Sequence, residues 1–268
     1  MMEHRILIVG GDLRQRELAR LLKRDKTADT LGVPGCPDTA REGTYAVVIL
    51  PCPAFDKEKR IRAEGGGIPA SAAAPYLGPG TRILGGGLGR GDADFLTRAG
   101  RARDLLQDPC FAAENARLTA EAAIALTMQK TGCSLYRAPC AVLGYGRIGK
   151  VLAGLLRGLG ALPAIAARRP EVRAEAESLG FRTASFQRAA AEAEYIFNTV
   201  PAPVLRPEQA AGLPRQTVWI ELASAPGGLP AGTEIPCTLL PAGGLPGKQL
   251  PLSAGRALYE AILRNWEE

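Results

Sequence analysis

A strand, a glycine loop and a helix follow one another directly in the middle of this chain. Residues 140–143 form a short apolar run, residues 144–149 carry glycine at their first, third and sixth positions, and a helical pattern continues to Gly158. The first glycine permits a tight turn, the second lets a ligand approach the backbone, and the third lets helix and strand pack closely. Unpaired N–H groups at the helix start favour an anion such as a pyrophosphate.

This order of elements predicts a Rossmann dinucleotide-binding unit. A glycine-rich turn without a ligand is the alternative, because the chain has 32 glycines. The loop residues that we expect to contact the cofactor are Gly144, Tyr145, Gly146, Arg147 and Ile148.

The residue that reads the adenosine ribose is expected about 20 positions after the loop, at the end of the second strand. An acidic residue there would accept hydrogen bonds from a free 2′-hydroxyl and repel a 2′-phosphate. This chain instead has Arg168 and Arg169, whose guanidinium groups suit a phosphate dianion. We therefore expect NADP rather than NAD, with NAD left open; the alternative is a pair of solvated arginines.

Apolar strands alternate with helical patterns along the chain, which predicts two Rossmann-like α/β domains with parallel sheets. Strands are expected at 5–9, 45–50, 81–84, 140–143, 162–167, 195–198 and 218–222, and helices at 13–23, 111–131, 147–158 and 254–266. We place an N-terminal substrate domain at residues 1–110 and an NADP-binding domain at 111–250, which includes the connecting helix 111–131. The C-terminal helix, within 251–268, is expected to pack back on the first domain.

Composition narrows the class of ligand. The formal net charge is +6, but basic residues alternate with acidic ones and aromatic residues are only 5%, so we expect no nucleic acid partner. Excess positive charge suits an anionic small molecule. No apolar run approaches the roughly 20 residues that span a bilayer, and the first residues read as a strand rather than as a leader. We expect a cytoplasmic protein with reduced thiols and no metal.

The chain has one histidine, His4, which precedes the first predicted strand. A 2-hydroxy-acid dehydrogenase normally uses a histidine as its base, and we assign His4 no catalytic role. Either another residue type is the base, or the reaction needs little assistance. Oxidation of a dihydropyridine-type ring meets the second condition, since aromatisation drives proton loss.

Several loops resemble one family over both domains. They are Gly10-Gly11-Asp12-x-Arg14-Gln15, Asn115 with Thr119-x-Glu121, the glycine loop, Ala167-Arg168, Asn198-Thr-Val-Pro201, Leu222-Ala-Ser-x-Pro-Gly-Gly228, Gly244-Leu-Pro-Gly247 and Ala254-Gly255. The chain is similar in these stretches to the A subunits of dipicolinate synthase, dehydrogenases of endospore-forming bacteria. The segment 65–91, rich in Gly, Ala and Pro, matches nothing in that family.

The resemblance implies an activity, a cofactor and a partner. The activity is oxidation of a cyclic dihydrodipicolinate-type intermediate of the lysine pathway to dipicolinate during sporulation, with NADP as hydride acceptor. The implied location is the mother cell, and the implied partner is the B subunit of dipicolinate synthase. We also expect a homo-oligomer.

Candidate substrate and catalytic residues follow the strand ends, where open α/β sheets bind ligands. Arg14 is a candidate for a substrate carboxylate, and Asp12 for orienting Arg14 or capping the helix. Lys248 is a candidate for the second carboxylate, and Glu121 for removing a ring proton. For each of these residues an ordinary surface or capping role is the alternative.

Further contacts are expected from both domains. Asn115 and Thr119 share one helix face and are assigned to the substrate. Thr199, Val200 and Pro201 are assigned to the cofactor, and Ser224 to both ligands near the nicotinamide. Two other functions stay open: a 2-hydroxy-acid or amino-acid dehydrogenase, and a non-catalytic NADP-binding regulatory subunit.

Overall fold

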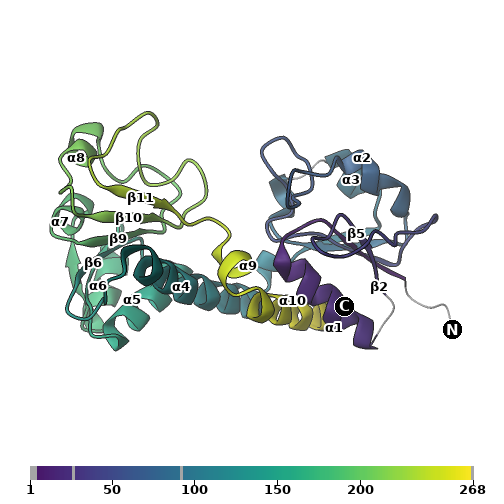
Figure 1. Cartoon of the computed structure of the whole chain (residues 1–268), viewed down its shortest axis with the longest axis horizontal. Coiled ribbons are helices and arrows are strands. Elements are labelled where there is room, and N and C mark those ends of the chain that lie inside the picture. The colour runs from purple at the N-terminus through teal and green to yellow at the C-terminus, as the bar shows by residue number, and fades with distance from the viewer. Residues whose placement is uncertain (1–4, 26–27, 91–92, 267–268) are drawn as a thin grey trace. The chain divides into compact units, whose positions relative to one another are not determined.

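The chain divides into two compact units in the computed structural model, which describes residues 5–25, 28–90 and 93–266 (Figure 1). Unit 1 comprises residues 1–115 and 246–268, and unit 2 comprises residues 116–245. The divisions fall within α4 (Pro109–Thr131), the predicted connecting helix, and within α9 (Leu245–Gln249). The sequence analysis placed these boundaries at residues 110 and 250.

Unit 1 is built on a parallel sheet in the order β2-β1-β3-β4-β5 within its described residues. The strands are β1 (Ile6–Val9), β2 (Ala28–Leu31), β3 (Val47–Ile49), β4 (Arg82–Gly85) and β5 (Arg101–Asp104). The helices are α1 (Leu13–Asp25), α2 (Ala70–Ala73), α3 (Ala93–Thr97) and α10 (Pro251–Trp266), with 3₁₀ turns η1 (Ala74–Tyr76), η2 (Leu88–Arg90) and η3 (Leu105–Gln107). This order reverses between β1 and β3, which makes their carboxyl ends the expected ligand crevice.

Unit 2 is built on a parallel sheet in the order β11-β10-β9-β6-β7-β8. The strands are β6 (Pro139–Leu143), β7 (Leu162–Ala166), β8 (Arg182–Ala184), β9 (Tyr195–Asn198), β10 (Val218–Glu221) and β11 (Thr238–Pro241). The helices are α5 (Arg147–Gly158), α6 (Pro170–Ser178), α7 (Phe186–Ala191) and α8 (Pro207–Ala211). Two halves of three strands meet between β6 and β9, as in a dinucleotide-binding Rossmann fold. The predicted fold class is confirmed.

The C-terminal helix α10 packs on α1 of unit 1. Gly255 makes this close approach possible, because a Cβ there would lie 2.6 Å from Glu17 Cβ and 3.0 Å from the Arg14 carbonyl oxygen. The predicted C-terminal helix therefore lies against the turn that carries Asp12 and Arg14. Residues from the two ends of the chain build this part of unit 1 together.

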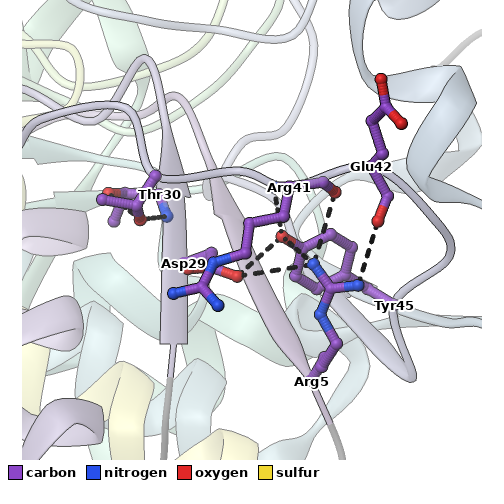
Figure 2. A network of polar contacts seen from close by, with 7 residues as sticks. Arg5, Asp29, Thr30, Arg41, Glu42 and Tyr45 are labelled. Carbon is purple, nitrogen blue, oxygen red and sulfur yellow. Dashed lines mark hydrogen bonds and ion pairs between the residues drawn. The ribbon is translucent and has the colours of Figure 1, made fainter.

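The long connection between β2 and β3 is fastened to the sheet edge by Tyr45, which is buried (Figure 2). Its hydroxyl donates to Asp29 Oδ2 at 2.7 Å and accepts from the Arg41 amide at 2.9 Å and from Arg5 Nη2 at 3.0 Å. Burial raises the pKa of this phenol. Arg5 and Tyr45 precede β1 and β3, and Asp29 lies in the first half of β2, so the network is remote from the carboxyl ends of the strands and its role is to hold the fold.

Candidate functional site

The glycine loop begins directly after β6, and each glycine has its own structural reason. Gly144 has a positive φ of 96°, and a Cβ on it would overlap the Thr199 hydroxyl. A Cβ on Gly149 would overlap the Gly144 carbonyl oxygen. These two positions therefore need glycine for the fold itself.

Gly146 differs from the other two glycines. It is the N-cap of α5 in an extended conformation, with φ −87° and ψ −160°, which any residue can adopt. A Cβ there would meet no atom of the described chain within 4 Å. Glycine at this position serves no packing need, and the open space lies at the helix N-terminus, where a pyrophosphate fits.

The neighbouring loop residues differ in exposure. Tyr145 is buried, with its ring edge-to-face on Phe181 at a centroid distance of 6.1 Å. Arg147 is exposed at the first position of α5, and Ile148 is half-buried. The loop accordingly fits a dinucleotide phosphate held by main-chain N–H groups.

The loop after β9 is locked onto the glycine loop. Thr199 donates its hydroxyl to the Leu143 carbonyl at 2.9 Å, so this side chain holds the turn at Gly144. Asn198, fully buried, closes a ring with Val200, donating to its carbonyl at 3.0 Å and accepting from its amide at 3.2 Å. Pro201 follows on the surface. Thr199 was expected to contact the cofactor, whereas its hydroxyl donates to the backbone of the chain itself.

Glu221, at the end of β10, is a central residue that the sequence analysis did not single out. Its carboxylate accepts hydrogen bonds from Asn198 Nδ2, Trp219 Nε1 and the amides of Ala223 and Gly228, at 2.7 to 3.1 Å. The loop 222–228 is thereby fixed at both of its ends. Ser224 lies exposed within that loop. The available signal was an acidic residue inside the apolar run 218–222.

Three arginines gather after β7. Arg168 and Arg169 are exposed, and Arg169 lies 3.4 Å from Glu171. Within the described residues, the Arg168 guanidinium has neither a hydrogen bond nor an ion pair. Arg173, which sequence reasoning missed, donates to the Ala167 and Arg168 carbonyls at 2.8 and 2.9 Å and so fixes the turn. The first two residues follow the end of β7, the position at which a Rossmann unit reads the adenosine ribose.

In unit 1, Asp12 and Arg14 form a partly buried ion pair after β1. Asp12 Oδ1 accepts from the Arg14 amide at 2.9 Å, which caps α1, and Arg14 Nη2 reaches Asp12 Oδ2 at 2.9 Å. The same Nη2 donates to the Cys52 carbonyl, after β3, at 2.8 Å. Burial alone would lower the pKa of the Arg14 guanidinium, but its hydrogen bonds and attraction to Asp12 outweigh burial and raise it.

The predicted roles of this pair can now be weighed. Asp12 both orients Arg14 and caps the helix. The Arg14 side chain is only 6% exposed, whereas Asp12 is 33% exposed. Asp12 is therefore the more accessible of the two groups, and the use of Arg14 as a carboxylate ligand stays a prediction.

Two further residues lie at this turn. Gln15 is fully buried; its Oε1 accepts from the Asp12 amide at 3.0 Å, while Nε2 has no hydrogen-bond partner within the described residues. The carbonyl oxygen of Arg62 accepts a hydrogen bond from the Gly11 amide at 2.7 Å, and the Arg62 side chain is exposed. The only side-chain hydrogen bond of Arg62 in the described part of the chain runs from Nε to the Phe55 carbonyl, at 2.9 Å. Sequence reasoning missed Arg62 because its segment carries no strand pattern.

The C-terminal segment reaches the same turn. Gly247, in α9, has no room for a side chain, because a Cβ would overlap the Asp12 carboxylate. The next residue, Lys248, is exposed. The last glycine of the motif Gly244-Leu-Pro-Gly247 thus has a structural reason, because it packs directly against the Asp12 carboxylate. Lys248 is the next residue in the chain.

The residues predicted on α4 separate into two faces. Asn115 and Thr119 are about one helical turn apart. Asn115 is half-buried and Thr119 is buried. Glu121 lies about 200° around the helix from Thr119, at about 100° per residue. It forms an ion pair with Arg117, which lies four residues earlier on the helix, and both side chains are partly exposed. The role of Glu121 in proton removal stays a prediction, and the helix gives it no shared face with Asn115 and Thr119.

Other chemistry-bearing groups are sparse. His4 lies outside the described residues, and these residues hold no cluster of three or more potential metal ligands. The six cysteines are free, and burial raises the pKa of Cys52 to about 12. None of the described helices is both long and apolar enough to cross a bilayer.

Comparison with known proteins shows which proteins this chain is similar to. Residues 113–207 match the model of the D-isomer specific 2-hydroxyacid dehydrogenase NAD binding domain. The A subunit of dipicolinate synthase from Bacillus subtilis (strain 168) is 29% identical over 163 residues, which are 59% of this chain and 55% of that protein. The match thus spans about half the length of this relative.

The resemblance to the A subunit of dipicolinate synthase is confirmed. The crystal structure of the Bacillus halodurans protein superposes with a TM-score of 0.84 at 23% identity, covering 99% of this chain and 98% of the other. That of the Bacillus subtilis protein gives 0.78 at 23% identity, with 100% and 97% covered. Both structures support the fold over its whole length. The NAD-binding domain supports a nicotinamide dinucleotide as cofactor and an oxidoreductase as the enzyme class.

Proposed function

We propose that this chain is an NADP-dependent dehydrogenase that oxidises a dihydrodipicolinate-type cyclic dicarboxylate to dipicolinate. The observation that carries the cofactor part is Gly146, a glycine that the fold does not require, at a helix N-terminus open to a phosphate. The substrate part rests on the resemblance to the A subunit of dipicolinate synthase.

For the cofactor, the loop amides after β6 hold the pyrophosphate, and Arg168 and Arg169 select the 2′-phosphate. Neither arginine has a buried partner that would compete for its guanidinium: both are exposed, and the Arg169 contact to Glu171 is 3.4 Å between two exposed side chains. Such a surface pair contributes little, about 0 to 1 kcal/mol. Both groups are thus available to a phosphate dianion.

For the substrate, the turn after β1 supplies the binding residues. Because the Arg14 guanidinium is committed to Asp12 and the Cys52 carbonyl, we assign the two carboxylates of the substrate to exposed cations near the turn, Arg62 and Lys248. Arg14 then acts by holding Asp12 in place. Asn115 and Thr119 are retained as further polar substrate contacts.

The reaction removes a hydride and a proton from the dihydropyridine ring, which becomes aromatic. When bound, the oxidised nicotinamide supplies the hydride acceptor. Asp12 is the proton acceptor in this proposal, because it is a partly exposed carboxylate at the switch point between β1 and β3 and is oriented by hydrogen bonds from the Arg14 guanidinium. No histidine is needed.

We further propose that the chain works with a partner of the dipicolinate synthase B type, in the mother cell of a spore-forming bacterium, as a homo-oligomer. These points rest on the resemblance alone. The family model raises a second candidate, a 2-hydroxy-acid dehydrogenase, since residues 113–207 match the cofactor domain of that family.

An anaerobic assay separates these functions. Dihydrodipicolinate is generated in place by its upstream synthase, and NADP and NAD are compared with and without the B-type partner, beside a panel of 2-hydroxy acids. The proposal expects dipicolinate with NADP and no oxidation of the hydroxy acids. Oxidation of a hydroxy acid would support the second candidate, and tight NADP binding without any turnover would support a regulatory role.

A further inference from the structure

The carboxylate of Glu221 is surrounded by hydrogen-bond donors. Oε1 accepts from Asn198 Nδ2 at 2.7 Å and from the Ala223 amide at 3.1 Å, and Oε2 accepts from Trp219 Nε1 and the Gly228 amide, both at 3.0 Å. All four partners are N–H groups. Both carboxylate oxygens therefore act as acceptors, each from two donors.

Glu221 has no ion pair within the described residues, so its charge is held by dipoles alone. A half-buried carboxylate is costly to desolvate, and four directed donors are an extensive arrangement to offset that cost. A simple loop anchor needs only one or two bonds. The number and direction of the donors indicate that this position is specified closely.

Glu221 joins two loops through Asn198. The Asn198 amide bonds both the Glu221 carboxylate and the Val200 backbone, so the loops after β9 and β10 form one frame. A Cβ on Gly228 would overlap the Asn198 side chain, which shows how tightly the end of the second loop closes on it. The frame carries the predicted cofactor residues Thr199, Val200, Pro201 and Ser224.

The sheet order shows which end of the cofactor this frame faces. A Rossmann sheet has two mononucleotide-binding halves, and the half that contains the glycine loop and the ribose-reading residue takes the adenosine. Here that half is β6-β7-β8, with Arg168 and Arg169 after β7. The half β9-β10-β11 is left for the nicotinamide, and Glu221 stands at the carboxyl end of its central strand.

We propose that Glu221 is a positioning residue for the nicotinamide half of the cofactor site, where it holds the loops after β9 and β10 in the arrangement that binds this half. The inference rests on the proposed function for the presence of a nicotinamide dinucleotide. It assigns Glu221 no direct chemistry.

The test separates the two halves of the cofactor. Dissociation constants for NADP⁺ and for 2′,5′-ADP, which lacks the nicotinamide half, are measured by calorimetry on the full chain and on Glu221→Gln. The amide keeps the shape of the side chain but turns an N–H group toward two of the four donors. We expect NADP⁺ to bind about tenfold more weakly or worse, which is about 1.4 kcal/mol. The affinity for 2′,5′-ADP should stay within about twofold.

The matched control is Glu194→Gln, which makes the same chemical change at an exposed residue directly before β9. This residue lies at the amino-terminal end of its strand, whereas Glu221 lies at a carboxyl-terminal end. It should alter neither constant. If Glu221→Gln does not fold, Asn198→Ser removes the bond between the two loops and carries the same expectation.

If the affinities for both ligands fall equally, Glu221 supports the unit as a whole. If NADP⁺ binding is unchanged, Glu221 supports nothing in the site. Either result overturns the inference and leaves the proposed cofactor intact. If the unmodified chain binds neither NADP⁺ nor NAD⁺, the proposed function itself fails and the inference falls with it. If NAD⁺ is the tighter ligand, NAD⁺ and AMP take the places of NADP⁺ and 2′,5′-ADP.

Discussion

Replacing Gly146 by Ala should separate cofactor binding from folding. The position has φ −87° and ψ −160°, which suits alanine, and the added methyl would meet no atom of the described chain within 4 Å. Alanine has fewer conformations than glycine in the unfolded chain, which stabilises the folded variant by about 0.4 to 1 kcal/mol. Alanine is a poorer N-cap than glycine, by about 1 kcal/mol. The two effects nearly cancel.

In the proposed complex, the same methyl group would occupy the space in which a pyrophosphate oxygen approaches the loop. Loss of one hydrogen bond to a charged oxygen costs about 1.5 to 3 kcal/mol. This corresponds to an increase of about 10-fold to 150-fold in the dissociation constant of the dinucleotide. The midpoint of thermal unfolding should meanwhile move by less than about 4 °C, since about 1 kcal/mol shifts a domain of this size by 2 to 4 °C.

Gly149→Ala is the matched comparison, because its methyl would overlap the Gly144 carbonyl oxygen. Overpacking of this kind costs about 1 to 3 kcal/mol, so this variant should unfold earlier. Differential scanning fluorimetry and calorimetric titration with NADP⁺ give both quantities for each protein. A Gly146→Ala protein that binds NADP⁺ as tightly as the parent would refute the reasoning, as would one that unfolds as early as Gly149→Ala.

Three further perturbations probe other parts of the account. Changing Arg168 and Arg169 together to Ala should weaken NADP⁺ at least tenfold while leaving NAD⁺ unchanged, because only the former carries the 2′-phosphate; equal loss in titrations of both would contradict their role. Asp12→Asn should lower kcat by about 100-fold or more with an unchanged NADP⁺ dissociation constant; steady-state rates near those of the parent would exclude Asp12 as proton acceptor. Tyr45→Phe removes the hydrogen bond to the buried Asp29 carboxylate, which keeps its longer ion pair with Arg5, and should destabilise unit 1 by about 1 to 3 kcal/mol in urea unfolding, with no effect expected on NADP⁺ affinity.

The sequence pattern identified the inner strands and missed the edge strands. The runs at 5–9, 45–50, 81–84, 140–143, 162–167, 195–198 and 218–222 correspond to β1, β3, β4, β6, β7, β9 and β10. The strands without a prediction, β2, β5, β8 and β11, are the outermost strands of the two sheets. These strands are about as long as the inner ones, but charged, polar or proline residues interrupt the apolar run in each of them, which an edge position tolerates. In β5, for example, the residues are Arg-Ala-Arg-Asp.

The residues of the candidate site likewise divide into those that the sequence made recognisable and those that it did not. Gly144, Gly146 and Gly149 were recognisable because their order next to a strand and a helix has few other uses. Glu221 and Arg62 were not, because their importance depends on partners distant in sequence: Glu221 bonds Asn198, and Arg62 lies on the Gly11 turn. Likewise, no local pattern shows that Arg14 is committed to Asp12 and to the Cys52 carbonyl.

The most direct test of the central claim is the stoichiometry of the reaction under anaerobic conditions. Dihydrodipicolinate is supplied by its synthase to the purified chain together with the B-type partner, NADPH is followed by its absorbance, and dipicolinate is quantified by chromatography. The account predicts that one NADPH appears for each dipicolinate formed and that no dipicolinate forms without the nucleotide. The account would be contradicted if dipicolinate accumulates at the same rate without the chain or without nucleotide. It would also be contradicted if no NADPH forms although NADP⁺ is bound.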